Sequence, residues 1–433
     1  MRHWFKDQHM RSLLKNSGYL GASRIVSAIA SVATLAFTGR ALGVILFGLL
    51  ILIHSYAKAA SSLSKFQSWQ IVVRYGGQGL AAGRPEDFKV ATGFSFGLDL
   101  LSGVVGMLLA MAILPFIGGW FGIPDRYMTI ALLYCTVIPT MQAMTPSGVL
   151  RTLDRFDLVS WGGVTYPIAR MILAGIAFAA DAPFEAYVAI WYVTDLGGDL
   201  FLWWLTRREL WRRGMGDALR PTLKPHLLKG AWPFAIRVNL TSSLTAAWGP
   251  IAQLIVGGLL GPASAAFYRV AATLSDSAQK PTDLLARAFY PEVMRLDPAT
   301  KRPWKLMLRG AALAAMFGIV AVALVALAGE PLIRLIFGEQ FTPAYAILVI
   351  LVIAPLLAMI SFPFEPMLYS LDRSDAPLKA RLVATGTYFL IIAPLCWRFG
   401  MQGAGAAFVI GTAIFVTLLA LQLWREFRRV RAR

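Results

Sequence analysis

Twelve charged residues fall inside long apolar stretches of this sequence, where a charge is costly and therefore informative. The basic ones are Arg24, Lys58, Arg170, Arg237, Arg269 and Lys280, and the acidic ones are Asp99, Asp195, Asp199, Asp276, Asp283 and Glu365. A Lys or Arg at the middle of a membrane helix costs about 2.5–3.5 kcal/mol on insertion scales, so such residues face a bundle interior or a water-filled cavity. A cationic cavity predicts binding of an anionic group such as a phosphate.

The spacing of several of these residues places them on two polar helix faces. The two series are His54, Lys58, Ser61 and Lys65 in one segment, and Arg269, Asp276, Lys280, Asp283 and Arg287 in another. We expect these faces to line one central cavity. Arg24 and Arg237, from opposite halves of the chain, are the strongest candidates for contact with an anionic substrate.

The alternative is that the charges pair with one another and hold helices together. Asp99, Asp195 and Asp199 could each pair with a neighbouring arginine, and Asp276 with Lys280 one turn away. The same acids could instead bind a coupling ion, Na⁺ or H⁺. The sequence leaves both readings of the acids open.

The elements that must position these residues are membrane helices. The 433 residues are 57% hydrophobic and only 15% charged, which is too little charge to cover a soluble protein of this size. Apolar stretches of sufficient length recur twelve times. The predicted spans are 17–39, 43–64, 90–115, 127–149, 158–180, 184–205, 231–257, 262–286, 306–328, 343–369, 378–397 and 402–424.

Loop charge predicts the orientation of these spans. Of the 41 Lys and Arg residues, 31 lie in the N-terminal tail and in every second loop after it, whereas Arg40, Arg126, Arg334 and Arg398 lie on the opposite side. The positive-inside rule then places both termini in the cytoplasm. The net charge of +18 is spread over these loops, which argues against a nucleic-acid partner.

An internal duplication is predicted from matches that recur in order at offsets of 213–218 residues. Leu42-Gly43 falls on Leu260-Gly261, and Leu153-Asp154-Arg155 falls on Leu371-Asp372-Arg373. We therefore expect two parallel six-helix repeats, with an N-terminal lobe at 1–206, a basic cytoplasmic linker at 207–229 and a C-terminal lobe at 230–433.

Enzyme chemistry has no support in the motifs. The sequence contains no Gly-x-Ser-x-Gly elbow, phosphate-binding loop or cluster with metal-ligand spacing. A membrane ligase or polymerase would also need long extracytoplasmic loops. We expect no catalytic residue, no metal and no cofactor beyond a coupling ion.

The turns that enter two of the spans resemble a known family. The run from Leu42 to Gly48, the later Leu260-Gly261-Pro262 and the Tyr268–Ala271 run are similar to the polysaccharide biosynthesis transporters. These Wzx-type flippases belong to the multidrug/oligosaccharidyl-lipid/polysaccharide exporter superfamily. The resemblance covers the whole chain as an all-α polytopic membrane protein of two six-helix lobes around a central cavity.

The resemblance implies a function in the bacterial inner membrane. It implies flipping of an undecaprenyl-pyrophosphate-linked oligosaccharide, with membrane lipids and other polysaccharide assembly proteins as partners. The rival hypothesis is a cation- or proton-coupled multidrug or metabolite exporter on the same fold. That rival predicts that acids outnumber bases inside the membrane, whereas this sequence places six bases beside six acids there.

Overall fold

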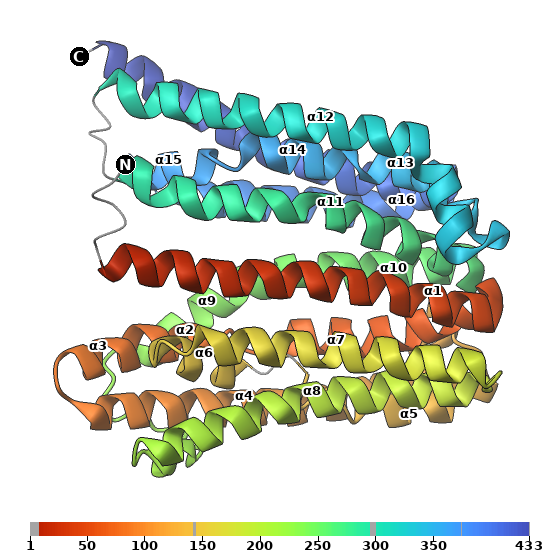
Figure 1. Ribbon diagram of the computed structural model, residues 1–433, viewed down its shortest axis with the longest axis horizontal. Coiled ribbons are helices and arrows are strands. Elements are labelled where there is room, and N and C mark those ends of the chain that lie inside the picture. The colour runs from red at the N-terminus through yellow and green to blue at the C-terminus, as the bar shows by residue number, and fades with distance from the viewer. Residues whose placement is uncertain (1–7, 142–143, 295–299, 374, 433) are drawn as a thin grey trace. The chain divides into compact units, whose positions relative to one another are not determined.

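Every regular element of the described chain is a helix. The computed structural model describes residues 8–141, 144–294, 300–373 and 375–432. Figure 1 shows its helices, which are long and packed side by side within each part of the chain. The longer helices are α1 (Gln8–Ser64), α4 (Pro85–Ile117), α7 (Phe156–Ala179), α8 (Phe184–Arg212), α11 (Pro262–Met294), α12 (Lys301–Phe337) and α16 (Asp375–Ala432).

Shorter helices connect these long ones. They are α2 (Trp69–Ile71), α3 (Gly77–Ala81), α5 (Met128–Cys135), α6 (Met144–Thr152), α9 (Ala231–Ala246), α10 (Trp248–Leu260), α13 (Ala344–Leu351), α14 (Ile353–Ser361) and α15 (Phe364–Ser370). A π-helical turn at Val72–Gly76 joins α2 to α3. The predicted all-α membrane fold is confirmed by this helical architecture together with the structural comparisons given below.

Six helical stretches of the described residues are long and apolar enough to cross a membrane. Two of them hold a pair of predicted spans each. Helix α1 has a non-helical residue at Gly43, with φ 68°, and α16 has one at Gly400, with φ 60°. Glycine adopts these positive φ values without the Cβ clash that other residues meet. Each bend therefore separates two of the predicted spans.

The predicted spans 127–149 and 343–369 are each interrupted. Helix α5 ends at Cys135, and turns that include Pro139 follow before α6 begins at Met144. In the second half, α14 ends at Ser361 and α15 begins after Pro363. Proline lacks the N–H that a continuous helix needs, so it favours a break in each span.

Positive backbone φ angles recur at equivalent positions in the two halves of the chain, as an internal duplication predicts. Left-handed φ values occur at Gly43 and Gly261, at Gly122 and Gly338, and at Asp154 and Asp372. These pairs are separated by 216 or 218 residues, which matches the offset of the sequence repeats. A positive φ at aspartate is uncommon, so its recurrence at φ 58° in the same Leu-Asp-Arg turn supports a common origin of the halves.

Two compact units divide the chain. Unit 1 comprises the described residues of Met1–Leu42 and Leu50–Leu254, and unit 2 those of Gly43–Leu49 and Ile255–Arg433. Unit 1 thus extends beyond the predicted lobe and linker and includes α9. Ala231 and Ala235 of α9 pack with Phe94 of α4 in one buried cluster.

Candidate functional site

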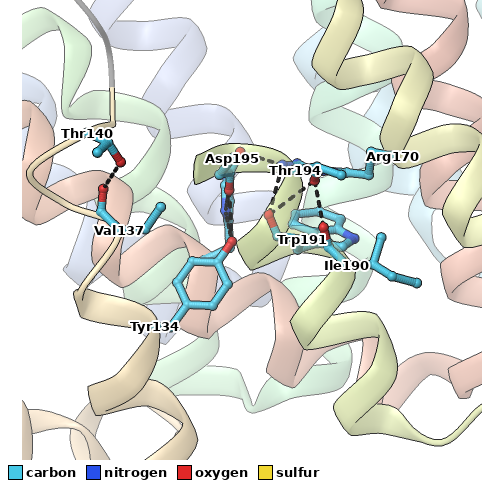
Figure 2. A network of polar contacts seen from close by, with 9 residues as sticks. Tyr134, Val137, Thr140, Arg170, Ile190, Trp191, Thr194 and Asp195 are labelled. Atoms are coloured by element: carbon cyan, nitrogen blue, oxygen red, sulfur yellow. Dashed lines mark hydrogen bonds and ion pairs between the residues drawn. The ribbon is translucent and has the colours of Figure 1, made fainter. Parts of the chain in front are cut away.

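A buried polar network lies inside unit 1 where four helices meet (Figure 2). His54 comes from α1, Tyr134 from α5, Arg170 from α7, and Thr194 and Asp195 from α8. His54, Tyr134 and Arg170 are all less than 10% exposed. Polar groups at this depth require partners, because an unpaired one loses its hydration without compensation.

The Asp195 carboxylate is the centre of the network. One oxygen forms an ion pair with the Arg170 guanidinium. The other accepts a hydrogen bond from the Tyr134 hydroxyl at 2.8 Å and lies 3.3 Å from His54 Nδ1. Both carboxylate oxygens are therefore engaged by side chains from three different helices.

The Arg170 guanidinium is satisfied in the same way. Its Nε donates to Thr194 Oγ1 at 2.7 Å, and one of its terminal nitrogens donates to the Trp191 carbonyl at 3.2 Å. The Trp191 ring lies 4.7 Å from the guanidinium carbon and packs edge-on against the His54 ring at 5.0 Å. Trp191 is 1% exposed, so it shields the ion pair from solvent.

The protonation of His54 sets the charge of this network. Arg170 and Asp195 cancel one another, so a neutral His54 leaves the network uncharged and a protonated His54 adds one positive charge. Histidine is the side chain that most readily changes charge near neutral pH. A protonated His54 would share the Asp195 carboxylate with Arg170 and Tyr134. The described residues include no group of three His, Cys, Asp or Glu side chains that could hold a metal ion.

A second buried carboxylate, Asp99 of α4, bridges Ser68 to the start of α6, beside the break in an interrupted span. It accepts hydrogen bonds from the Thr145 amide at 2.9 Å, from the Thr145 hydroxyl at 2.7 Å and from the Ser68 hydroxyl at 2.6 Å. Lys65 donates to the carbonyl of Met141, on the other side of the break. The break leaves the Thr145 amide and the Met141 carbonyl without helical partners. The amide donates instead to the buried Asp99 carboxylate, and the carbonyl accepts from the buried Lys65 amine.

The other predicted site residues occupy varied positions. Arg24 and Lys58 are exposed on α1, Asp199 is half-buried on α8, and Arg269 is half-buried on α11. Asp276 is exposed on α11. The side chains of Arg237, Lys280 and Asp283 lie outside the described residues.

Glu365 forms an ion pair within unit 2. Its carboxylate lies 3.2 Å from Arg381, whose guanidinium carbon sits 3.7 Å from the centre of the Phe415 ring. The structure thus brings Arg170 together with Asp195, and Glu365 together with an arginine that was not a predicted site residue. Helix α9, which carries Arg237, belongs to unit 1, although it falls within the predicted C-terminal lobe at 230–433.

Tyr134, Thr194 and His54 were missed as site residues. His54 carried a signal, since it begins the polar series that ends at Lys65. Tyr134 carried none, because a tyrosine in an apolar stretch is more often an anchor at the membrane boundary. Thr194 precedes Asp195 directly, but hydroxyl side chains are common in membrane helices.

Comparison with known proteins gives the family context. Residues 84–346 match the model of a family described as polysaccharide biosynthesis protein. The Inner membrane protein YghQ of Escherichia coli (strain K12) is 40% identical over 347 residues, covering 80% of this chain and 98% of that protein.

Solved structures share the fold. An inward-facing multidrug resistance MATE family transporter of the MOP superfamily aligns with a TM-score of 0.71 at 14% identity, covering 97% of this chain and 98% of that one. A Vibrio cholerae MATE transporter aligns with a TM-score of 0.65 at 14% identity and the same coverage. At these identities the similarity shows the fold alone, and the chain has the fold of the MATE transporters.

Proposed function

This chain belongs to the polysaccharide biosynthesis protein family, and from that premise we propose that it is a flippase. It translocates an undecaprenyl-pyrophosphate-linked oligosaccharide across the bacterial inner membrane by alternating access. The observation that supports the proposal is the combination of family and fold. The sequence matches a polysaccharide biosynthesis family, and 97% of the chain aligns with the fold of a transporter. The name of the Escherichia coli relative supports the inner membrane as its location.

The charge of the chain favours an anionic substrate. Arg24 and Lys58 are exposed on α1, and a cation on a membrane helix is costly against lipid, so a water-filled space is the favoured surrounding. A pyrophosphate carries about two negative charges. Moving these charges outward across a membrane whose potential is negative inside gains about 2.3 kcal/mol per charge per 100 mV. This gain favours outward movement of an anionic substrate.

The buried network of unit 1 supplies a place for a coupling proton. The Asp195 oxygens are already engaged by Arg170, Tyr134 and His54. A sodium ion needs several free oxygen ligands, whereas a proton needs only the His54 ring nitrogen. We therefore favour H⁺ over Na⁺ at this position.

The rival function is export of cationic drugs on the same fold, as the names of the MATE neighbours suggest. A cationic drug needs a carboxylate that is available to it. Three buried or half-buried acids of the described chain already have partners: Asp99 with Ser68 and Thr145, Asp195 with Arg170, and Glu365 with Arg381. This pairing favours the anionic substrate.

The test is transport in proteoliposomes. A fluorescent polyprenyl-pyrophosphate oligosaccharide is supplied on one side, and its appearance on the other is followed for wild type, Arg24→Ala and Arg237→Ala. Arg84→Ala is the matched control, because Arg84 is a highly exposed loop arginine paired with Asp87 at 3.2 Å. We expect flipping to be lost in the first two variants and retained in the control.

Other outcomes would count against the proposal. Equal flipping in all four proteins would remove Arg24 and Arg237 from substrate binding. If wild type leaves the labelled lipid unmoved and transports a cationic dye, the drug-exporter function replaces the flippase.

A further inference from the structure

We propose that a groove at the end of α8 binds the headgroup of an anionic phospholipid. The groove has a volume of about 900 Å³. It lies within unit 1, between the last turns of α8, one face of α4 and the segment 214–220 that follows α8. The residues that matter to the argument are Phe96, Trp203, Trp204, Arg207, Trp211 and Arg220.

The segment after α8 is held against α4, so the groove is a built feature. The Thr222 amide donates to the Gly93 carbonyl at 3.0 Å. A Cβ atom at Gly97 would lie 2.5 Å from the Thr222 carbonyl oxygen, so only glycine permits this contact. Lys89 of α4 forms an ion pair with Asp217 at 3.0 Å. These contacts fix the wall of the groove that carries Arg220.

Three indole rings form the apolar part of the groove. Trp203 packs against Phe96 with ring centroids 4.6 Å apart, and Trp204 stacks on Phe201 at 5.8 Å. Trp204 and Trp211 are both more than half exposed. Exposed tryptophans at the end of a membrane helix are typical of the boundary between lipid and water. They offer the upper acyl chain and glycerol region of a lipid an apolar surface.

Two arginines supply the charge. Arg207 and Arg220 line the groove and are exposed. In the part of the chain that the structure describes, neither forms an ion pair with a carboxylate. By contrast, Arg213 on the same helix is paired with Glu209 at 2.8 Å. The one acid that lines the groove, Asp217, shares Lys89 with Glu86 and also lies within the electrostatic influence of Arg220.

The occupant follows from this combination. Arginine recognises phosphate oxygens through paired N–H donors, and two arginines against the single acid Asp217 leave an excess of positive charge in the groove. A free phosphate would not need the indole surface, and a zwitterionic lipid would bring its own cation. An anionic phospholipid uses both parts of the groove.

The test is lipid retention by the full-length protein in detergent, measured by native mass spectrometry with equal amounts of phosphatidylglycerol and phosphatidylcholine. We expect wild type to retain at least one phosphatidylglycerol in preference to phosphatidylcholine. In Arg207→Gln/Arg220→Gln, loss of the charged hydrogen bonds should weaken that binding by about tenfold or more. Arg212→Gln, on the same helix outside the groove, is the matched control.

If the double variant unfolds, the single variant Arg220→Gln replaces it in the measurement, because it changes only one exposed residue of the segment 214–220. Equal retention of the two lipids by wild type would overturn the proposal, and so would unchanged phosphatidylglycerol retention in the variants. Displacement of the lipid by 1 mM inorganic pyrophosphate would reassign the groove to a soluble phosphate. The measurement involves no transport, so its outcome is independent of the proposed flippase activity.

Discussion

Arg170 on α7 and Asp195 on α8 form an ion pair that is shielded by the ring of Trp191 and shared with Tyr134 and His54. Each charge is nearly removed from solvent, so each depends on the other for its stabilisation. Such a pair contributes little net stability by itself, but breaking it leaves one charge without compensation.

Replacement of Arg170 should therefore be more damaging than replacement of the whole pair. We expect Arg170→Met to destabilise the protein by about 3–5 kcal/mol, because the Asp195 carboxylate loses its counter-charge. Arg170→Met/Asp195→Leu should recover a large part of that loss. Thermal unfolding in detergent, followed by tryptophan fluorescence, measures both. Equal destabilisation in the single and double variants would contradict the ion-pair interpretation.

His54 is the residue of this network that we expect to couple transport to protons. In His54→Gln the network keeps the Arg170–Asp195 pair but loses the titratable ring. Flipping by wild type in proteoliposomes should change with an imposed pH gradient, and flipping by His54→Gln should not. Tyr192→Phe is the control, since Tyr192 bonds to Thr136 at 2.8 Å outside the carboxylate contacts. A variant that keeps the full dependence on the gradient would exclude His54 from coupling.

Asp99 should be important for stability because it bridges Ser68 and Thr145 beside the break in the fourth span. Asp99→Asn keeps the size of the side chain but replaces one acceptor oxygen with a donor, which then faces Ser68 or Thr145. An unsatisfied buried group of this kind costs about 1–3 kcal/mol. Ser102→Ala, one turn along α4, should cost less, about 0.5–1 kcal/mol, because Ser102 gives up only one long hydrogen bond, 3.5 Å to the Asp99 carbonyl. Thermal unfolding of the two variants checks the difference, and equal effects would speak against the bridging role.

Glu209, at the end of α8 and outside the predicted membrane spans, should make a pH-dependent contribution to the stability of the fold. Burial raises the pKa of Glu209, but hydrogen bonds from Arg213 at 2.8 Å and Arg155 at 2.5 Å leave it below its ordinary value of 4.5. A carboxylate whose pKa is lower in the folded than in the unfolded protein stabilises the fold fully above pH 4.5. This stabilisation is lost as the pH falls through the pKa of the folded state.

We therefore expect Glu209→Gln to lower the unfolding temperature at pH 7, by an amount that corresponds to about 1.5–3 kcal/mol. The difference from wild type should shrink as the pH falls below 4.5. Unfolding temperatures measured from pH 3.5 to 7.5 test this, with the exposed Glu185→Gln on the same helix as control. A difference that is the same at every pH would rule out the charged carboxylate as its source.

Two glycines of α16 should respond to alanine in opposite directions. Gly400 has φ 60° and Gly386 has an ordinary helical φ, and neither would meet a heavy atom within 4 Å of an added Cβ. Gly400→Ala should cost about 1–3 kcal/mol, because φ 60° with ψ −145° is a backbone conformation that glycine adopts freely and alanine avoids. Gly386→Ala should stabilise by about 0.5–1 kcal/mol because the unfolded chain loses freedom. A change of the same sign at both positions, in thermal unfolding, would contradict the bend at Gly400.

The class of the protein could be predicted from the sequence, because hydropathy depends on composition within each segment. The long apolar stretches required membrane helices, and the predicted boundary between the first two spans falls at the bend at Gly43. The Leu-Asp-Arg repeat was visible as well, and Asp154 and Asp372 adopt the same left-handed turn. These features are local, so the residues near them in sequence are sufficient to specify them.

The sequence by itself therefore determined the fold class, the approximate spans and the presence of charges inside them. Tertiary structure decided which charges meet. Asp195 could have paired with several arginines, and the contact with Arg170, Tyr134 and His54 exists only because α1, α5, α7 and α8 pack around one point. The groove beside Arg207 and Arg220 likewise depends on a segment that folds back onto α4. Hydropathy acts along the chain, whereas pairing depends on distances across it, and only the packed helices set those distances.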